Sequence, residues 1–326
     1  MTRLTVRTET WPLAKAFTIS RGTRTEAHVV VVELEAGGIR GRGEGVPVPR
    51  YGLDAAAVAE QVEAQRSALE GGLTREALQE RLAPGPARCA LDCAFWDLES
   101  KHSARPAWDL AGLDAPLPLV TALTISMDTP ERMAADAKAA AALPLLKVKL
   151  DGEQVLERVA AVREAAPAAR LVVDANEAWS PELTAEVLPG LAELGVEMIE
   201  QPLPAGADRA LQGIERRVPI CADESCHDAA SVAGLEACYD MVNIKLDKTG
   251  GLTEALKLRA AAEARSLGIM VGCMIGTSLS MAPATLVAQG AAVVDLDGPL
   301  WLKEDRGEGL VFEAGMIHPP SAALWG

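Results

Sequence analysis

The sequence has 326 residues, of which 31 are Lys or Arg and 46 are Asp or Glu, so its formal net charge is −15. This charge argues against nucleic acid or an anionic membrane surface as the main partner. Hydrophobic residues make up 49% of the chain and charged residues 24%, which is typical of a globular protein and excludes a disordered or fibrous one.

The sequence shows no sign of export or membrane insertion. Its first thirteen residues include Arg3, Arg7 and Glu9 and no long apolar stretch, so we expect no signal peptide. The longest apolar run, residues 139–146, is far below the ~20 residues that a membrane-spanning helix needs. The six cysteines are scattered, and none is spaced with another Cys or a His as in a zinc site. We therefore expect a reduced, cytoplasmic protein.

The N-terminal part of the chain combines strands with helices. Apolar and β-branched runs predict strands near residues 4–6 and 28–35, with a polar loop, residues 20–26, between them. A glycine-rich turn follows. Helical patterns then occupy residues 54–70, 74–82 and 86–101. This order indicates an α+β domain at residues 1–115.

After residue 116 short apolar runs recur regularly. The eight runs cover residues 119–124, 145–150, 171–174, 196–200, 218–223, 241–246, 269–274 and 292–295. Helical segments separate most of them, at 129–142, 153–165, 181–194 and 252–267. This alternation predicts an α/β fold, a (β/α)8-type barrel at residues 116–298. The tail, residues 299–326, leaves the pattern, and we expect it to rejoin the N-terminal domain.

Ionisable residues stand at the ends of nearly all the predicted barrel strands, where barrel enzymes carry their catalytic groups. Such groups are costly inside apolar strands unless they are paired or bound to metal. Asp174, Glu200 and Asp223 end three consecutive strands and should converge at the barrel mouth. Three carboxylates with no His or Cys neighbour favour Mg²⁺, with Mn²⁺ as the alternative, over zinc.

Two lysines should face each other across the barrel. Lys149 and Lys245 lie on the second and sixth strands, half a turn apart in a ring of eight. Lys147 shares a face with Lys149, and its charge and that of a metal should favour the neutral amine that a base needs. Two opposed bases and a metal suit one reaction: a proton α to a carboxylate is removed, and an enediolate is reprotonated on its other face.

At these motifs the sequence resembles the enolase superfamily, and within it the dipeptide epimerases, most closely those that act on L-Ala-D/L-Glu. The matching stretches are RGTRTEAHVVVVE, KVK, VDANEAW, EQPL, CADES, NIKLDKTGG and DLDGP, which together span essentially the whole chain. The resemblance implies a modified (β/α)7β barrel whose mouth is capped by the N-terminal domain. It assigns Lys149 and Lys245 as the acid/base pair and Asp174, Glu200 and Asp223 as Mg²⁺ ligands. It also implies an isomerase that works in peptidoglycan recycling.

Further residues are candidates for binding the substrate. Asp295 and Asp297 put two carboxylates at the end of the eighth strand, where they can pair with an ammonium group. In dipeptide epimerases such a pair holds the free α-amino group of the dipeptide. Thr124, at the end of the first strand, resembles a family substrate contact, and Lys147 completes the set.

The polar loop of the N-terminal domain holds two arginines that compete for one role. Arg24 is our candidate for binding a carboxylate side chain in a bidentate manner, and Arg21 is the alternative. Asp247 and Lys248 follow Lys245 closely, and the sequence gives them no role. The expected partner is a small-molecule dipeptide with a free amino terminus and an acidic second residue, with Ala-Glu as the first choice. A homo-oligomer is possible.

Two other interpretations stay open. The chain could be another enzyme of the superfamily, such as an N-acylamino acid racemase, a muconate cycloisomerase or an o-succinylbenzoate synthase. Asp295 and Asp297 speak against these. It could also be a barrel that has lost catalysis and serves in binding. The complete set of two lysines and three carboxylates speaks against that, and an assay of α-proton exchange would separate the two classes.

Overall fold

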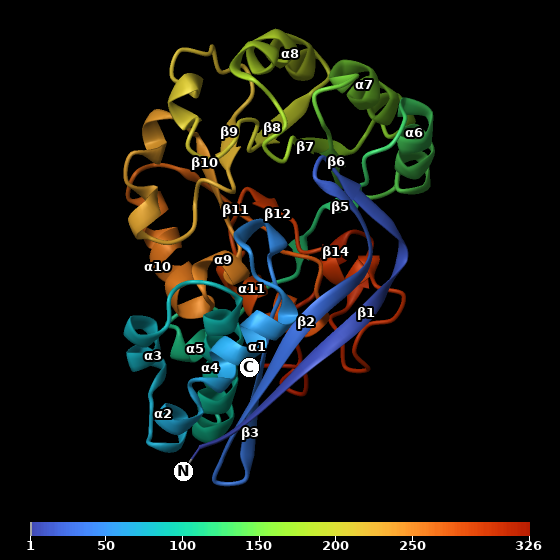
Figure 1. Ribbon diagram of the computed structural model, residues 1–326. Coiled ribbons are helices and arrows are strands. Elements are labelled where there is room, and N and C mark those ends of the chain that lie inside the picture. The colour runs from blue at the N-terminus through green and yellow to red at the C-terminus, as the bar shows by residue number, and fades with distance from the viewer. Residues whose placement is uncertain (1) are drawn as a thin grey trace.

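In the computed structural model, which describes residues 2–326, eight parallel strands form a ring with helices outside it (Figure 1). The strands are β5 (Leu123–Ile125), β6 (Leu145–Lys149), β7 (Arg170–Asp174), β8 (Val196–Glu200), β9 (Ile220–Ala222), β10 (Met241–Ile244), β11 (Gly268–Val271) and β12 (Val293–Val294). Strands that follow each other in sequence are neighbours in the sheet. The backbone N–H of Ala122 donates to the carbonyl of Val294 at 2.8 Å and closes the ring. The predicted barrel is confirmed.

Helices cover the outside of the ring, and the four helices predicted there are confirmed. The helices of this part of the chain are α6 (Pro130–Ala139), α7 (Val155–Ala165), α8 (Pro181–Glu193), α9 (Leu246–Thr249), α10 (Leu252–Glu263) and α11 (Ser278–Val287). The connections on either side of β9 are formed by turns and short 3-10 helices. These are η2 (Asp208–Leu211), η3 (Ala230–Val232) and η4 (Leu235–Ala237), with η5 (Gly298–Trp301) following β12.

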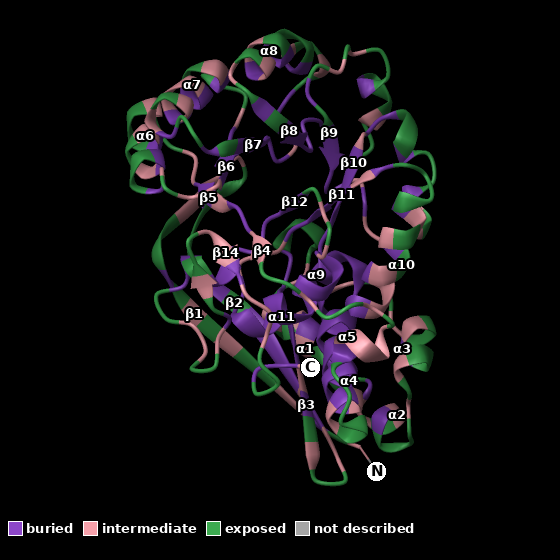
Figure 2. Ribbon diagram, turned by 180° about the vertical axis from the view of Figure 1, so that it is seen from behind, coloured by how far each residue is buried: buried purple, intermediate pink, exposed green. Residues whose placement is uncertain are grey.

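The bottom of the barrel is filled by one apolar layer. Each strand, or the residue next to it, contributes one buried side chain to this floor: Ala122, Leu145, Val172, Met198, Cys221, Met241, Met270 and Val293. Figure 2 shows the strands of the ring as buried elements. Because the floor closes the amino-terminal end of the barrel, a ligand can reach the interior only from the carboxyl end of the strands.

The N-terminal residues form a separate cap, a three-stranded antiparallel sheet with helices against it. Its elements are β1 (Arg3–Ile19), β2 (Gly22–Ala36), β3 (Ile39–Gly45), η1 (Pro49–Tyr51), α1 (Ala55–Glu63), α2 (Arg66–Glu70), α3 (Arg75–Arg81), α4 (Pro86–Ser103) and α5 (Ala107–Leu110). The glycine-rich stretch is a turn only at Gly37 and Gly38. Gly43 lies in β3, where a Cβ atom would stand 2.1 Å from the carbonyl oxygen of Ala90 in α4. Glycine there allows the helix to lie directly on the sheet.

The predicted polar loop at residues 20–26 is wrong. Only Ser20 and Arg21 form a turn, and β2 begins at Gly22. Arg24 pairs with Phe17 of β1, so the hairpin continues as two strands almost to its tip. This hairpin extends from the cap to the barrel (Figure 1). Its polar residues are exposed here because the strands have left the apolar core of the cap.

The C-terminal residues contact both parts of the molecule. The strand β14 (Met316–Ile317) pairs with β13 (Phe312–Glu313) on one side and with β4 (Leu119–Val120), beside the barrel floor, on the other. Trp325 is buried between α4 of the cap and the barrel, where its indole N–H donates to the carbonyl of Cys93 at 2.9 Å. The domain boundaries at 115 and 298 stay a prediction. The six cysteines are free thiols, and no helix within residues 2–326 is long and apolar enough to cross a membrane.

Candidate active site

The polar residues predicted at the strand ends lie above the apolar floor of the barrel. Because side chains alternate along a strand, the residue two positions after a floor residue also points inward. Lys147 follows Leu145 in this way, and Asp174 follows Val172. The buried inward set is Thr124, Lys147, Lys149, Asp174, Glu200, Asp223, Asn243, Lys245 and Asp295. The period of two therefore gathers residues that are scattered over 170 positions of the sequence.

The three predicted metal ligands are buried next to one another. Asp174 of β7 lies beside Glu200 of β8 in the strand register, and Asp223 follows β9 directly. Lysines pair with these carboxylates: Asp174 Oδ2 is 2.6 Å from Lys149 Nζ, and Asp223 Oδ2 is 2.6 Å from Lys245 Nζ. Lysine ammonium groups therefore lie between the carboxylates. Within residues 2–326, no three acidic, thiol or imidazole side chains are arranged as a metal site in this structure.

The donor chemistry of this group nevertheless fits a hard cation. Every candidate ligand atom is a carboxylate oxygen, which Mg²⁺ and Mn²⁺ prefer over the sulfur and imidazole ligands of zinc. Glu200 Oε2 is buried without a well-directed hydrogen bond, although Lys147 Nζ lies 2.6 Å from it as an ion pair. An oxygen with unused acceptor capacity can take a cation at a low cost. Asp174, Glu200 and Asp223 are therefore the residues that would hold one.

Carboxylates determine the charge state of two of the lysines. Burial opposes the charged form of Lys147, but three neighbouring carboxylates outweigh it and hold its pKa well above the ordinary value. Burial likewise opposes the charge of Lys245, while Asp223 and Glu200 raise its pKa above the ordinary value. Lys147 therefore keeps the positive charge that was expected beside Lys149. The neutral amine expected of Lys149 stays a prediction.

Two residues without a role in the sequence analysis complete the site. Lys248 Nζ lies 2.6 Å from Asp223 Oδ1 and also donates to the carbonyl of Asn243 at 3.1 Å. Asn243 Nδ2 donates to Glu200 Oε1 at 2.8 Å. Asn243 could have been found, because it stands two residues before Lys245 on β10 and must share its face. Lys248 lies in α9, beyond the strand, where alternation gives no signal.

A cavity of about 350 Å³ lies over this layer, between the barrel and the cap. The cap supplies its roof through the tip of the β1–β2 hairpin and the segment around η1. The barrel supplies both lysines, Lys149 and Lys245. Among the lining residues are Phe17, Ile19, Arg21, Arg24, Arg50, Tyr51, Thr124, Lys147, Asn176, Asp223, Glu224, Cys273, Asp295 and Asp297. The cavity therefore brings together all the predicted substrate residues.

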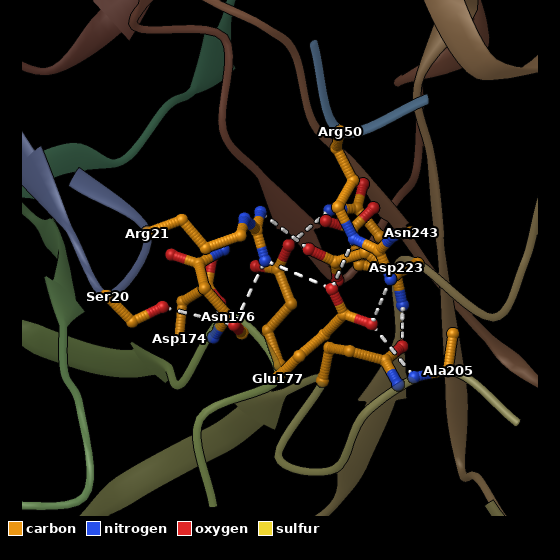
Figure 3. Close-up of polar contacts among 12 residues, drawn as sticks. Ser20, Arg21, Arg50, Asp174, Asn176, Glu177, Ala205, Asp223 and Asn243 are labelled. Atoms are coloured by element: carbon orange, nitrogen blue, oxygen red, sulfur yellow. Dashed lines mark hydrogen bonds and ion pairs between the residues drawn. The ribbon is translucent and has the colours of Figure 1, made fainter. Parts of the chain in front are cut away.

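The two competing arginines differ in what they bind. Arg21 lies 2.9 Å from Glu224 Oε1 and 3.2 Å from Glu177 Oε2, so its guanidinium is already paired with the barrel (Figure 3). Arg24 lines the cavity, and no carboxylate of residues 2–326 contributes to its charge balance; burial and Arg21 lower its pKa. Arg24 is therefore the arginine that is available to a ligand.

The two aspartates after β12 are prepared for a positive group. Asp297 Oδ2 accepts from the backbone N–H of Thr124 at 2.7 Å and from the indole N–H of Trp301 at 3.2 Å. Burial and the charge of Asp295 raise the pKa of Asp297 to about 6. Asp295 Oδ2 lies 2.7 Å from Lys147 Nζ, while its other oxygen is buried with no hydrogen bond from residues 2–326. A cation in the cavity would offset the repulsion between the two aspartates and would give the free oxygen of Asp295 a partner.

Comparison with known proteins places this site in a family. Residues 1–112 match the mandelate racemase/muconate lactonizing enzyme N-terminal domain, and residues 131–323 match the enolase C-terminal domain-like family. The chain is 48% identical to an L-Ala-D/L-Glu epimerase of Escherichia coli K12, with 95% of this chain and 97% of that protein covered. It is 41% identical to an N-acetyl-D-glutamate racemase of a Pseudoalteromonas species, with 91% and 95% covered.

Solved structures agree with the sequence comparison. An enolase family member from Agrobacterium tumefaciens with homology to dipeptide epimerases, solved with bound sodium and L-Ala-L-Glu, has a TM-score of 0.98 at 51% identity over the whole of both chains. A dipeptide epimerase from Enterococcus faecalis V583, complexed with Mg and L-Leu-L-Tyr, has a TM-score of 0.92 at 30% identity over 99% of this chain and 98% of that one. The chain therefore belongs to the mandelate racemase/muconate lactonizing enzyme family of the enolase superfamily.

Proposed function

We propose that the protein is a Mg²⁺-dependent dipeptide epimerase that inverts the α-carbon of the C-terminal residue, with L-Ala-D/L-Glu as its substrate. The observation that carries the proposal is the set of buried groups facing one cavity: Lys149 and Lys245 on strands four apart in a ring of eight, and the pair Asp295 and Asp297. The names of the relatives support it, since the Escherichia coli protein at 48% identity is an L-Ala-D/L-Glu epimerase.

The lysines perform the proton transfers in this proposal. One lysine takes the α-proton from one face of the substrate, and the other returns a proton to the opposite face, so that the configuration inverts. When bound, Mg²⁺ supplies the positive charge that stabilises the enediolate. The carboxylates of Asp174, Glu200 and Asp223 would hold it. The cap covers part of the cavity, and the exclusion of water by a bound substrate would strengthen each of these charge interactions.

The remaining polar groups would orient the dipeptide. Asp295 and Asp297 would bind its ammonium group, for which Asp295 still has an unused buried oxygen. Arg24 would bind the acidic side chain of the second residue, since Arg21 is occupied by Glu177 and Glu224. Thr124 would act mainly through Asp297, to which its backbone N–H donates. The proposed source of the substrate is peptidoglycan-derived dipeptides in the cytoplasm. The oligomeric state of the protein can be measured by size-exclusion chromatography.

The relative from Pseudoalteromonas keeps one alternative in consideration. It is an N-acetyl-D-glutamate racemase at 41% identity, and an N-acylated substrate has no ammonium group for Asp295 and Asp297. The two aspartates would then lose their partner while buried, which is costly. We therefore place the racemase second.

One experiment separates these functions. L-Ala-L-Glu and N-acetyl-L-glutamate are each incubated with the Mg²⁺-loaded protein in D₂O, and the α-proton signal and the new epimer are followed by NMR. We expect epimerisation of the dipeptide at a kcat/KM at least ~10-fold above that of the N-acetyl compound, because a charge-assisted hydrogen bond contributes ~1.5–3 kcal/mol. Equal or inverted preference would put the racemase first, and no exchange on either compound would argue against an enzyme of this type.

A further inference from the structure

Two separate segments of the cap reach the same carboxylate of the barrel. The first is the hairpin tip, residues 19–24, and the second is the segment of residues 48–52 around η1. Both line the cavity, and the hairpin tip carries Arg24. Glu177, in the loop after β7, lies between them (Figure 3). Glu177 is half-buried as a residue, but its side chain is only 8% exposed, so its carboxylate is largely covered by these neighbours.

The acceptor capacity of Glu177 is filled by these two segments and its own barrel. Arg50 Nε and Nη2 each donate to one of its oxygens at 2.8 Å, which makes a bidentate pair. Arg21 Nη1 donates to Oε2 at 3.2 Å, and the backbone N–H of Ala205 donates to Oε1 at 2.8 Å. A carboxylate has about four acceptor positions. Bonds to a charged donor are the stronger ones.

The backbone around Glu177 is arranged to make these bonds. Asn176 and Glu177 have φ values of 44° and 67°, a left-handed conformation that is unfavourable for residues other than glycine. The backbone N–H of Glu177 donates to the carbonyl of Gln201 at 2.9 Å, which fixes this turn to the β8 end. In return the carbonyl of Asn176 accepts from Ser20 Oγ at 3.1 Å and from Arg21 Nη1 at 3.0 Å. The strained turn therefore faces the hairpin tip with two acceptors.

We propose that Glu177 is a positioning residue that latches both cap segments to the barrel, so that they open and close as one unit. Glu177 does not line the cavity and touches no predicted catalytic group. It acts by holding the hairpin tip, and with it Arg24, against the barrel mouth. Its consequence for substrate selection rests on the proposed function, but the latch itself does not. The two segments are coupled because Arg21 and Arg50 bind the same carboxylate. If one arginine is lost, the carboxylate is held less firmly, and its bond to the other arginine weakens.

Hydrogen–deuterium exchange of the substrate-free protein tests the latch. In Glu177→Gln we expect backbone amides of both segments to exchange at least ~10-fold faster, equivalent to ~1.4 kcal/mol. The decisive variant is Arg50→Gln, which should also accelerate exchange in residues 19–24, although within residues 2–326 no hydrogen bond or ion pair joins Arg50 to that segment directly. Arg21→Gln is the reciprocal variant and should accelerate exchange in residues 48–52.

A matched control is available at the other end of the barrel. Glu197 of β8 pairs with Arg170 of β7 through two short contacts, 2.9 Å to Nε and 2.8 Å to Nη2. Glu197→Gln should leave exchange in both cap segments unchanged. A change confined to residues 48–52 in Arg50→Gln would overturn the coupling, and unchanged segments in Glu177→Gln would overturn the latch. If Glu177→Gln does not fold, the two surface arginine variants still decide the question.

Kinetics then separate a latch from a general structural role. With Ala-Glu as substrate, a less populated closed state should raise the KM of Arg50→Gln several-fold more than it lowers kcat, because the binding-competent fraction falls. An equal loss in kcat would contradict this assignment. Because exchange is measured without substrate, a protein that failed to epimerise dipeptides would leave the exchange result intact, and a failed latch would leave the proposed epimerase intact.

Discussion

The role proposed for Arg24 can be tested by removing its charge alone. Arg24→Met keeps most of the apolar stem of the side chain and deletes the guanidinium, so that packing beside Phe17 changes little. A charge-assisted hydrogen bond contributes ~1.5–3 kcal/mol. Because Arg24 is exposed to solvent at the cavity edge, we take the lower end, ~1.5 kcal/mol, which is about 10-fold in kcat/KM for Ala-Glu.

The assay compares two dipeptides by polarimetry or by deuterium incorporation at the α-carbon. Ala-Leu offers no second carboxylate, so its kcat/KM should change by less than about 3-fold, a difference below ~0.7 kcal/mol. Arg40→Met is the control, because Arg40 is also on the cap sheet but pairs with Glu35 at 3.2 Å and lies outside the cavity lining. Equal losses on Ala-Glu and Ala-Leu would refute the reasoning, because they would show that Arg24 supports the fold of the hairpin rather than the acidic side chain.

Three further predictions concern the metal, the bases and pH. Exhaustive chelation should abolish epimerisation and Mg²⁺ or Mn²⁺ should restore it; full activity in a preparation shown to be metal-free by elemental analysis would contradict the cation site. Lys149→Ala and Lys245→Ala should each lose epimerisation by at least ~10²-fold while keeping solvent exchange of one epimer, and full epimerisation by either variant would exclude the two-base geometry. Burial and Glu44 raise the pKa of Asp247 from 3.8 to about 7, so the folded protein keeps a proton that the unfolded chain loses, and the free energy of unfolding should fall as pH rises from about 4 to about 7. Asp247→Asn keeps an acceptor for the backbone N–H of Val46, which bonds Asp247 Oδ1 at 2.7 Å. It should therefore raise Tm at pH 8 more than at pH 5, and an equal shift at both values would contradict the raised pKa.

The barrel could be predicted because its strands carry two signals at once. Each strand is an apolar run, and most end in an ionisable residue that an ordinary buried strand would not tolerate. Helix α11 shows the limit of this approach. All ten of its residues are buried, so it has no polar face and no period of 3.6 from which a helix could be recognised. The connections around β9 contain 3-10 helices, which are too short to leave a periodic pattern.

The sequence predicts which residues line the barrel mouth, but it does not predict the contacts between the cap and the barrel. Alternation along a strand fixes which residues point inward, and it places both lysines and all three carboxylates on the inner face of the barrel. Contacts between the cap and the barrel join residues far apart in sequence, such as Arg50 and Glu177, 127 positions apart, and no local pattern encodes them. The charge of Lys245 likewise depends on its short distances to Asp223 and Glu200, which no local pattern in the sequence gives.

The position of Trp325 has a consequence for synthesis of the chain on the ribosome. Its indole N–H donates to the carbonyl of Cys93, 232 residues earlier, and its side chain is buried between α4 and the barrel. At a translation rate of about 5–20 residues per second, roughly 10–50 seconds separate these two residues. The core of the cap itself is built from residues between 4 and 98 and does not wait for the barrel. The face of α4 that carries Cys89, Cys93 and Trp96 packs against the barrel and Trp325 instead, so this apolar face stays uncovered on the nascent chain until the C-terminal residues have been made.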